Sequence, residues 1–446
     1  MVQVSPAARA VASPVVGETV VGQASVGQDF RKSLTIIVAL GAVLRIVRLA
    51  VSKWNLPLQL NDSLYYSIQA RQLAHGVWYR ELFVDQPGAE HGPLTSALMA
   101  VVSWGNDPVN LQRIVTVTCG TATIAIVGII ARRVAGDRAD RNRVGLIAAA
   151  VAALYPNLWV NDGLVMSESV SCLMISLALW ALLVWTAKPA LRSAAFVGLA
   201  MGLGTLARSE VALFMPAAAV VMWTVTRRSG AKPWSHVATA AGVAVATVLP
   251  WLIFNIVRFD RPVLLTTNEG PALLGANCED TYYGPAQGGW SLFCVLDDPG
   301  TKLDEDPSTR SARQRREALS YVRHHLDRLP NIEVKRVARS LDLFALHNMV
   351  HGDVGEERER WASWACIVSF WILAPLAVFG AKLTRRRDRA VLLIPVAIAL
   401  AATVLIYGGH RIRSAAEPSI VILAAIAINH VLARSTTVLD SAEGVA

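Results

Sequence analysis

The stretch YGGHRIRSAAEPSIVILAAIAINHVLAR occupies residues 407–434 and contains the arrangement that decides the fold. A turn rich in glycine and arginine is followed by Pro418, which suits the first turn of a helix, and then by an apolar block. Similar blocks of roughly 15–23 residues recur along the chain between short charged stretches, a pattern typical of membrane-spanning helices. We therefore expect an all-α polytopic membrane protein.

The composition agrees with this fold class. The 446 residues are 54% hydrophobic and 17% charged, with a mean hydropathy of +0.42, whereas about a quarter of the residues of a soluble domain are charged. A further apolar block at 93–104 is too short to cross a bilayer of about 30 Å, so we expect an interfacial or re-entrant helix there. The sequence predicts about ten spans, at 34–51, 111–131, 144–160, 169–187, 193–207, 211–226, 236–257, 361–381, 389–407 and 418–434.

The basic residues predict the orientation. With ten spans, the main groups of Lys and Arg in short loops fall on one side, which is then cytoplasmic. This orientation places residues 52–110, 161–168 and 258–360 outside the plasma membrane and both termini inside. Because most of the net charge of +9 lies in these loops, we do not interpret it as a nucleic-acid surface. The groups are Arg31–Lys32, Arg132–Arg143, Lys188–Arg192, Arg227–Lys232 and Lys382–Arg389.

The two ends of the chain are predicted to be tails. Residues 1–30 mix Ser, Pro, Gly, Gln and Ala without a long apolar run, so we expect a disordered cytoplasmic tail rather than a secretory signal. The membrane domain then covers residues 31–435, and residues 436–446 form a second cytoplasmic tail.

The long outer segment 258–360 is expected to form a small subdomain. It contains Cys278 and Cys294, for which we predict a disulfide on the oxidising side of the membrane; the alternative is two free thiols in a flexible loop. Residues 308–329 are strongly basic and are interpreted either as an amphipathic helix on the membrane or over the site, or as a solvated connector.

Several polar residues in the outer segments are candidates for chemistry. Asp62, in Asn61-Asp62-Ser63-Leu64-Tyr65-Tyr66, either caps a short helix or acts as a general base at the membrane surface. Tyr65 lies on the same helical face as Asp62. His91 is either an interfacial polar residue or part of a site. Asp162 and Glu168 flank an outer turn, where structural and site roles remain open.

Arginines in the segments predicted to lie outside are the strongest indication of a binding site. If the turn before Pro418 is extended, Arg411 and Arg413 point the same way and form a phosphate clamp; the alternative is non-specific contact with lipid headgroups. Arg208 either pairs with Glu210 or holds an anion. Arg45 and Arg48, near the outer end of the first span, are explained by snorkelling to the interface.

The motifs of several common enzyme and transporter sites are absent from this sequence. The sequence contains no Walker loop, no His/Cys cluster with zinc-ligand spacing and no Gly-Xaa-Ser-Xaa-Gly elbow. An ATP-driven pump is therefore not indicated. A divalent metal is compatible with the outer carboxylates, but the sequence does not require one.

The order of these features resembles the GT-C membrane glycosyltransferases, in particular family 39 with its protein O-mannosyltransferases and lipid A aminoarabinose transferases, and most of all their actinobacterial members. The resemblance covers residues 34–434. Its motifs are Asp62–Tyr65, His91–Leu94, Met166–Glu168, Ala207–Glu210, Asn277–Cys294 and Arg411–Pro418.

This sequence departs from the family pattern at Ser63, Gly92, Ala415 and Ala416. These departures bear on which sugar and acceptor are used.

The resemblance implies a polyprenyl-phosphate sugar donor and an acceptor hydroxyl on a cell-envelope glycan, lipid or protein. Asp62 would be the general base of an inverting transfer, and Arg411, Arg413 and Arg208 would hold the leaving phosphate. Tyr65, His91, Asp162, Glu168 and Glu210 would contact sugar or acceptor.

Two other functions remain open. A transporter or flippase of lipid-linked glycans would explain the spans and arginines, but it would not need Asp62 and should show inverted repeats. A scaffold partner of an envelope enzyme is the other, although it gives no reason to keep Asp62 with both arginines.

Overall fold

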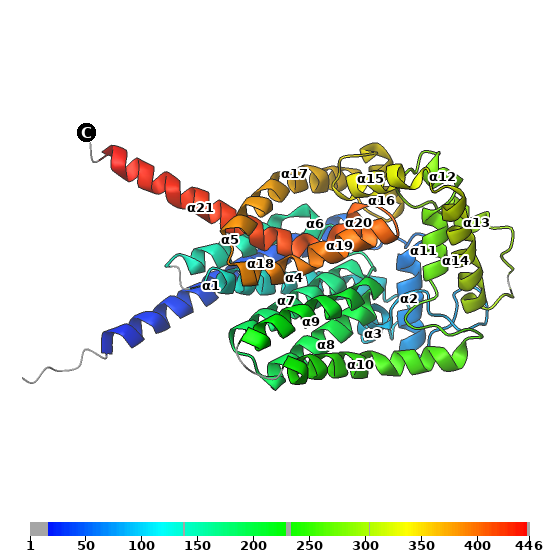
Figure 1. Cartoon of the computed structure of the whole chain (residues 1–446), viewed down its shortest axis with the longest axis horizontal. Helices are drawn as coiled ribbons and strands as arrows, with labels where there is room; N and C mark the ends of the chain where they lie inside the picture. Colours follow the sequence, from blue (N-terminus) through cyan, green and yellow to red (C-terminus); the bar gives the residue numbers. More distant parts are fainter. Residues whose placement is uncertain (1–16, 137–138, 229–232, 303, 444–446) are drawn as a thin grey trace, which may run out of the picture.

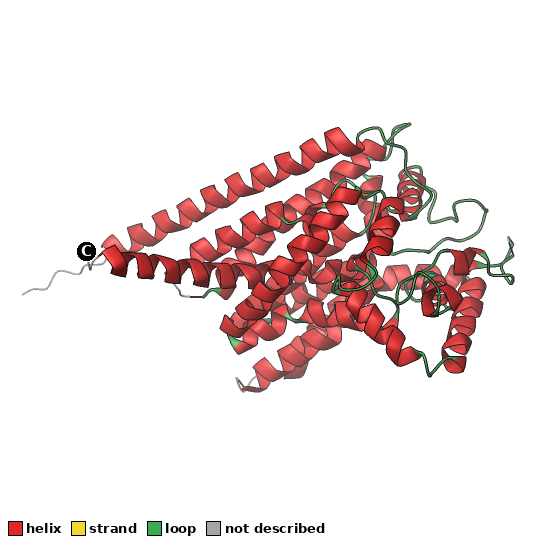
Figure 2. Cartoon of the chain, turned by 90° about the horizontal axis from the view of Figure 1, so that it is seen from above, coloured by secondary structure: helices red, strands yellow, loops and turns green. Residues whose placement is uncertain are grey.

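The protein is described from a computed structural model, which covers residues 17–136, 139–228, 233–302 and 304–443. Helices dominate these residues, which contain no β-strand and only one isolated bridge, between Arg80 and Pro87 (Figure 2). The all-α class is confirmed.

Long helices run side by side along the longest axis of the molecule (Figure 1). The C-terminal helix α21 and α7 are the most buried of the long helices, because neighbours pack around them. α21 packs against α17, α5 and α4, while α8 packs against both α7 and α10. The bundle helices are α1 (Gly17–Arg48), α4 (Val109–Val134), α5 (Arg141–Leu154), α7 (Glu168–Ala187), α8 (Leu191–Ala207), α9 (Phe214–Arg228), α10 (Pro233–Arg258), α17 (Arg360–Leu383), α18 (Arg386–Leu392), α19 (Ile394–Leu405) and α21 (Glu417–Glu443).

Eight segments of the described chain are long and apolar enough to cross a membrane. The expected ten comprise these eight, the shorter helix α8, and the segment 144–160, which is not one continuous helix. There α5 ends at Leu154 and α6 (Pro156–Trp159) begins a new turn. Tyr155 is extended because the ring of Pro156 disfavours helical backbone at the preceding residue. The count of ten is therefore not established by length and composition alone.

The helical ends extend further than the sequence predicts. α1 begins at Gly17, inside the segment that we expected to be disordered up to residue 30, and α21 continues to Glu443 beyond residue 436. Residues 1–16 of the expected tail lie outside the described residues. Extending a helix that a membrane span has already nucleated requires little further free energy, because only nucleation is costly.

Short helices and long loops gather at one end of the bundle, on the right in Figure 1. The disulfide between Cys278 and Cys294 lies among them. The basic segment 308–329 is divided between two helices, of which the first, α14, packs against α11. The helices at this end are α2 (Asp62–Ala74), α3 (Pro93–Ala100), α11 (Glu269–Ala276), α12 (Glu279–Tyr282), α13 (Phe293–Leu296), α14 (Pro307–His324), α15 (Leu329–Ser340) and α16 (Leu346–Gly355).

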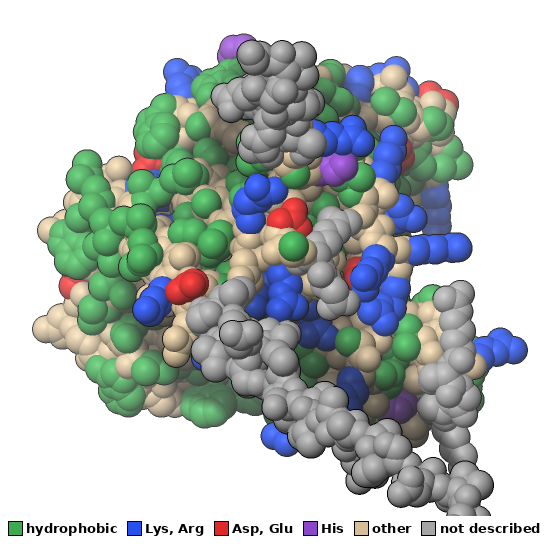
Figure 3. All heavy atoms as spheres, turned by 90° about the vertical axis from the view of Figure 1, so that its left-hand side faces the viewer, with side chains coloured by type: hydrophobic (Ala, Val, Ile, Leu, Met, Phe, Trp, Pro, Cys, Tyr) green, Lys and Arg blue, Asp and Glu red, His purple; other side chains and the backbone are tan. Residues whose placement is uncertain are grey.

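The opposite end carries many basic side chains. Figure 3 looks onto this end and shows Lys and Arg side chains grouped between hydrophobic surfaces. Arg132 and Arg133 lie in the last turn of α4, and Lys382 lies in the last turn of α17. The orientation predicted from the sequence places this end in the cytoplasm.

Candidate functional site

Asp62 is the first residue of α2 but is not its cap. Asn61 caps the helix, because its side-chain oxygen accepts a hydrogen bond from the backbone N–H of Ser63 at 2.8 Å. The Asp62 carboxylate is thereby left for other partners. It is 26% exposed and contacts Arg411 and His91.

His91 lies against the aromatic face of α2. Its ring stacks on Tyr66 with centroids 5.1 Å apart and meets Tyr65 edge-on at the same separation. Its Nε2 lies 3.4 Å from Asp62 Oδ1, within ion-pair distance. Gly92, where the family pattern favours proline, is explained by packing, since a Cβ there would lie 2.3 Å from the carbonyl oxygen of Leu206 at the end of α8.

Arg411 joins the first and last parts of the chain. Its guanidinium pairs with Asp62, with Glu168 at the start of α7, and with Glu356 at 3.0 Å. Arg208 contacts the same Glu168 at 2.9 Å and also Glu210, next to it along the chain, at 2.5 Å. We call Asp62, His91, Glu168, Arg208, Glu210, Glu356 and Arg411 the charged cluster.

The expected pairing of Arg411 with Arg413 is not observed. Residues His410–Arg413 form a helical turn, α20, rather than an extended segment, so side chains two residues apart diverge. Arg413 is 5% exposed and binds Asp342 at 2.7 Å and Glu417 at 2.6 Å, with Phe370 below its guanidinium. The premise that both arginines point the same way is therefore wrong.

Asp162 also lies apart from the charged cluster. It is 2% exposed and pairs with Arg45 of α1 at 2.5 Å, while Ser169 donates a hydrogen bond to it at 2.6 Å. Arg48 donates to the Asp162 carbonyl oxygen at 2.8 Å. Snorkelling is therefore the wrong explanation for Arg45, because its guanidinium is buried in an ion pair that joins α1 to the turn before α7.

Sequence reasoning missed the run Glu356–Glu359, which lies between α16 and α17. Glu357 accepts hydrogen bonds from Ser63 and from the backbone N–H of Gln59, and Glu359 pairs with Arg48 at 2.7 Å. Arg358 binds Asp353 at 2.8 Å, and Asp353 in turn holds His410 at 2.8 Å. The available signal was the density of charge, five charged residues in a row from Glu356 to Arg360, directly before an apolar stretch.

Electrostatics keep Asp62 ionised. Burial alone would raise the pKa of the Asp62 carboxyl, but Arg411 and then His91 outweigh it and hold that pKa well below its usual range. Burial alone would lower the pKa of His91, but Asp62 outweighs burial and raises it. The carboxylate is therefore available as a base, and it becomes stronger if Arg411 moves away.

No three His, Cys, Asp or Glu side chains of the described residues are arranged to hold a metal ion. Asp62 and Glu168 both contact Arg411. One oxygen of Glu168, Oε2, is buried without a hydrogen-bond partner.

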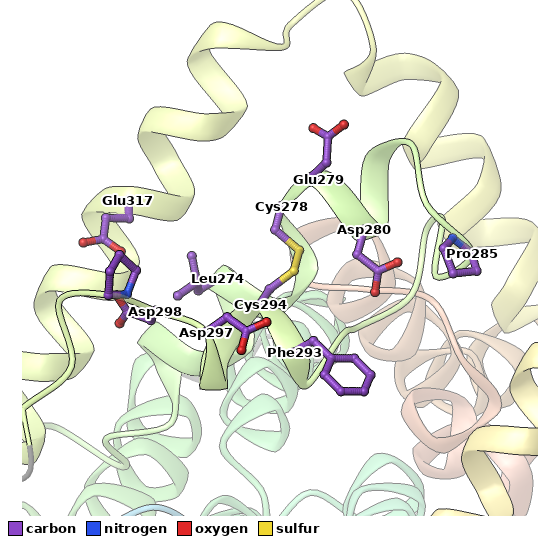
Figure 4. A pocket seen from close by; sticks show the side chains of 11 residues that line it. Leu274, Cys278, Glu279, Asp280, Pro285, Phe293, Cys294, Asp297, Asp298 and Glu317 are labelled. Carbon is purple, nitrogen blue, oxygen red and sulfur yellow. A yellow bond between two sulfur atoms is a disulfide. The ribbon is translucent and has the colours of Figure 1, made fainter.

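Two hollows open in the outer subdomain. One, of about 600 Å³, lies beside the Cys278–Cys294 disulfide, has several acidic side chains on its wall (Figure 4), and includes no residue of the charged cluster. The other, of about 480 Å³, lies between residues 261–267 and α14 and reaches Ser209, between Arg208 and Glu210. The second hollow is thus lined by a residue that adjoins two members of the charged cluster in sequence.

Comparison with solved structures identifies the fold. The structure of the oligosaccharyltransferase AglB from Archaeoglobus fulgidus, in complex with an inhibitory peptide and a dolichol-phosphate, matches with a TM-score of 0.57 at 16% identity. The match covers 93% of this chain and 52% of AglB. The chain has the GT-C fold. The resemblance found in the sequence is confirmed at this level, whereas the narrower likeness to actinobacterial members stays a prediction.

Other comparisons agree with the GT-C assignment. The family model described as dolichyl-phosphate-mannose-protein mannosyltransferase matches residues 91–254. An oligosaccharyltransferase from Archaeoglobus fulgidus, tethered with an acceptor peptide via a disulfide bond, has a TM-score of 0.57 at 16% identity, covering 91% of this chain and 50% of that chain. ArnT from Cupriavidus metallidurans, bound to undecaprenyl phosphate, has a TM-score of 0.44 at 15% identity over 88% of this chain and 77% of ArnT, too low to carry an argument. No curated protein matches significantly. The chain spans about half the length of AglB.

Proposed function

We propose that this protein is a glycosyltransferase that moves a sugar from a polyprenyl-phosphate donor to an acceptor hydroxyl at the outer face of the plasma membrane, with inversion. The observation that carries the proposal is the direct contact between Asp62 and Arg411 at one end of a GT-C bundle. In this proposal the base, Asp62, and the phosphate-binding cation, Arg411, belong to one site. Dolichol-phosphate in the AglB complex and the mannosyltransferase family match support a lipid-phosphate donor.

The reaction requires one base and one anion-binding group. Asp62 takes the proton of the acceptor hydroxyl while that oxygen bonds to the anomeric carbon of the donor. The bond from this carbon to the phosphate oxygen breaks, and polyprenyl phosphate leaves with both electrons. Arg411 and Arg208 stabilise the negative charge that develops on the leaving group.

Donor binding also prepares the base. In the free protein Arg411 neutralises Asp62, and this contact weakens Asp62 as a proton acceptor. A donor phosphate draws this guanidinium towards itself, since Arg binds phosphate oxygens bidentately, while the Asp62 side chain stays in place. Once Arg411 turns to the phosphate, Asp62 keeps only His91 as a charged partner and becomes more basic.

The remaining residues have different parts in this proposal. We assign Tyr65, Glu168 and Glu210 to the sugar or acceptor side of the site, because Tyr65 accepts a hydrogen bond from the His91 backbone N–H and both glutamates pair with Arg208. Arg413 is a positioning residue, because its buried pairs with Asp342 and Glu417 hold the turn from which Arg411 projects. Asp162 acts through the packing of α1. No step requires a metal ion.

The orientation follows from charge. The basic end of the bundle in Figure 3 faces the cytoplasm, and the charged cluster at the opposite end faces outward, where a lipid-linked donor is exposed. Both termini are then cytoplasmic.

The test is sugar transfer in reconstituted vesicles, with radiolabelled polyprenyl-phosphate sugars and a crude envelope fraction as acceptor. Asp62→Asn should abolish transfer while the protein still inserts and binds donor. Asp85→Asn is a matched control, because Asp85 is a 92% exposed acid of the same outer segment that pairs only with Arg80. It should transfer normally.

Normal turnover by Asp62→Asn would remove the base assignment. If wild type moves labelled donor across the bilayer without transferring sugar, the protein is a transporter or flippase of lipid-linked glycans instead.

A further inference from the structure

We infer that Glu356 is the carboxylate that a lipid phosphate displaces from Arg411, and that it thereby sets how tightly the site holds this ligand. The inference rests on the proposed function of the charged cluster and concerns a residue to which sequence reasoning gave no role. It starts from the number of carboxylates around one guanidinium.

Each nitrogen of the Arg411 guanidinium already contacts a carboxylate. Its Nε meets Glu168, its Nη2 meets Asp62, and its Nη1 meets Glu356 at 3.0 Å. The neighbouring Arg208 is likewise shared by Glu168 and Glu210. An incoming anion must therefore take the place of one carboxylate, since two anions on the same N–H donors would repel each other.

Glu168 cannot easily be the carboxylate that moves. Its side chain is fully buried at the start of α7 and is held by Arg208 as well as Arg411. Swinging its side chain away would break both contacts and leave a buried charge without a partner, which is costly.

Asp62 is also a poor candidate. It is the first residue of α2, and His91 stays beside it at 3.4 Å. A short aspartate side chain at the start of a helix has little freedom to swing away, so its contact with Arg411 is broken by movement of Arg411 rather than of Asp62.

Glu356 has the freedom that the other two lack. Its side chain is 29% exposed, and its second charged neighbour, Arg358, lies 3.6 Å away, beyond hydrogen-bond distance. Two glycines of α16 that precede Glu356, Gly352 and Gly355, have open space where a Cβ would point. A change of side-chain rotamer can therefore carry the carboxylate from Arg411 towards Arg358 and water.

The backbone around Glu356 is firmly held, so the movement is confined to one side chain. Glu357 binds the N-terminal end of α2, Arg358 donates to Asn161 at 3.0 Å, and Glu359 pairs with Arg48. These contacts connect the run to three separate parts of the bundle. We therefore do not expect a loop to open.

This arrangement gives Glu356 an effect opposite to that of an ordinary binding residue. Its carboxylate competes with the phosphate for Arg411 and regains the guanidinium when the product leaves. Removing its charge should strengthen the binding of lipid phosphate about twofold to fivefold, the range for a partly exposed charge pair. It should also slow release of the polyprenyl-phosphate product.

The experiment measures binding of a short-chain polyprenyl phosphate to the purified full-length protein in detergent with EDTA, with inorganic phosphate as a competitor. Glu356→Gln and Glu356→Ala should both bind more tightly than wild type. Glu333→Gln is the matched control, because Glu333 is 25% exposed and pairs with an arginine of α15, Arg336, outside the cluster. It loses the same charge and should bind like wild type.

Unchanged or weaker binding by both folded Glu356 variants, with wild type still binding, would overturn the inference and leave the proposed function intact. Equal tightening by Glu333→Gln would also overturn it, because net charge alone would then explain the effect. If wild type binds no lipid phosphate, the proposed function fails and this inference fails with it. Competition by inorganic phosphate at similar concentrations would show that the phosphate group, rather than the lipid chain, displaces Glu356.

Discussion

The buried ion pair between Arg45 and Asp162 allows a quantitative test of the structure. Both residues are 2% exposed, and the Arg45 guanidinium also donates to carbonyl oxygens of Gly41, Ala152 and Ala153. Arg45→Met leaves a buried carboxylate without its countercharge, and breaking such a pair from one side costs about 3–5 kcal/mol. Asp162→Asn should lower the free energy of unfolding by a similar amount, because it leaves the buried Arg45 guanidinium without its countercharge.

The double variant should be much less destabilised than the sum of the two. Replacing both members of a buried pair by uncharged residues of similar size is often nearly neutral, so we expect Arg45→Met with Asp162→Asn to lie within about 2 kcal/mol of wild type. Thermal unfolding of wild type, the two single variants and the double variant, purified in one detergent, completes a double-mutant cycle. Sugar transfer by the same four proteins is measured at a temperature below all four melting temperatures.

Two results would refute this reasoning. Additive losses would show that the two side chains do not interact as the structure describes. An Asp162→Asn protein of normal stability without transfer activity would return Asp162 to the sugar site, the role that the family resemblance implied.

Three further predictions concern single residues. Burial, and then Glu90, raise the pKa of Glu81 to about 7. Between about pH 4.5 and 7 the folded state therefore keeps a proton that the unfolded state loses, so the free energy of unfolding falls as the pH rises. The loss reaches up to about 3 kcal/mol, at 1.4 kcal/mol per pKa unit. Glu81→Gln should therefore raise the melting temperature at pH 8 but not at pH 4. Arg413→Ala should cost about 3–5 kcal/mol in thermal unfolding, whereas Arg411→Ala should stay folded and lose binding of lipid phosphate. Gly120→Ala should lower the melting temperature, because its Cβ would lie 2.0 Å from the Asp162 carboxylate.

The fold could be predicted largely from local sequence. Apolar length identifies a span because the bilayer sets a minimum helix length, and this property does not depend on neighbouring helices. The segment around Tyr155 shows the limit of that reasoning. Hydropathy is continuous across it, but the backbone breaks before Pro156, so a count of apolar blocks does not equal a count of continuous helices.

The candidate site could be predicted only in part. Asp62, Arg208, Glu168 and Arg411 were found because charged residues at the outer ends of spans need an explanation. Their partners depend on tertiary packing, which spacing along the chain does not encode. The expected alignment of Arg411 with Arg413 assumed an extended turn, and one helical turn was enough to separate them.

Glu356 shows a different limit. Nothing in its local sequence distinguishes it from Glu357 or Glu359, since all three are acids before the same apolar span. Only the packing of α16 against the bundle directs one of them to Arg411 and the other two to α2 and α1.

The contact between Asp62 and Arg411 joins residues that are 349 positions apart. Because a ribosome delivers the chain from its N-terminus, Asp62, Glu168 and Glu210 emerge long before the arginine that completes their charge balance. A nascent chain released before residue 411 should therefore lack both the Arg411 guanidinium and the contact between α2 and α20. The charged cluster can therefore form only after α19 has been synthesised, so chains released earlier cannot contain it.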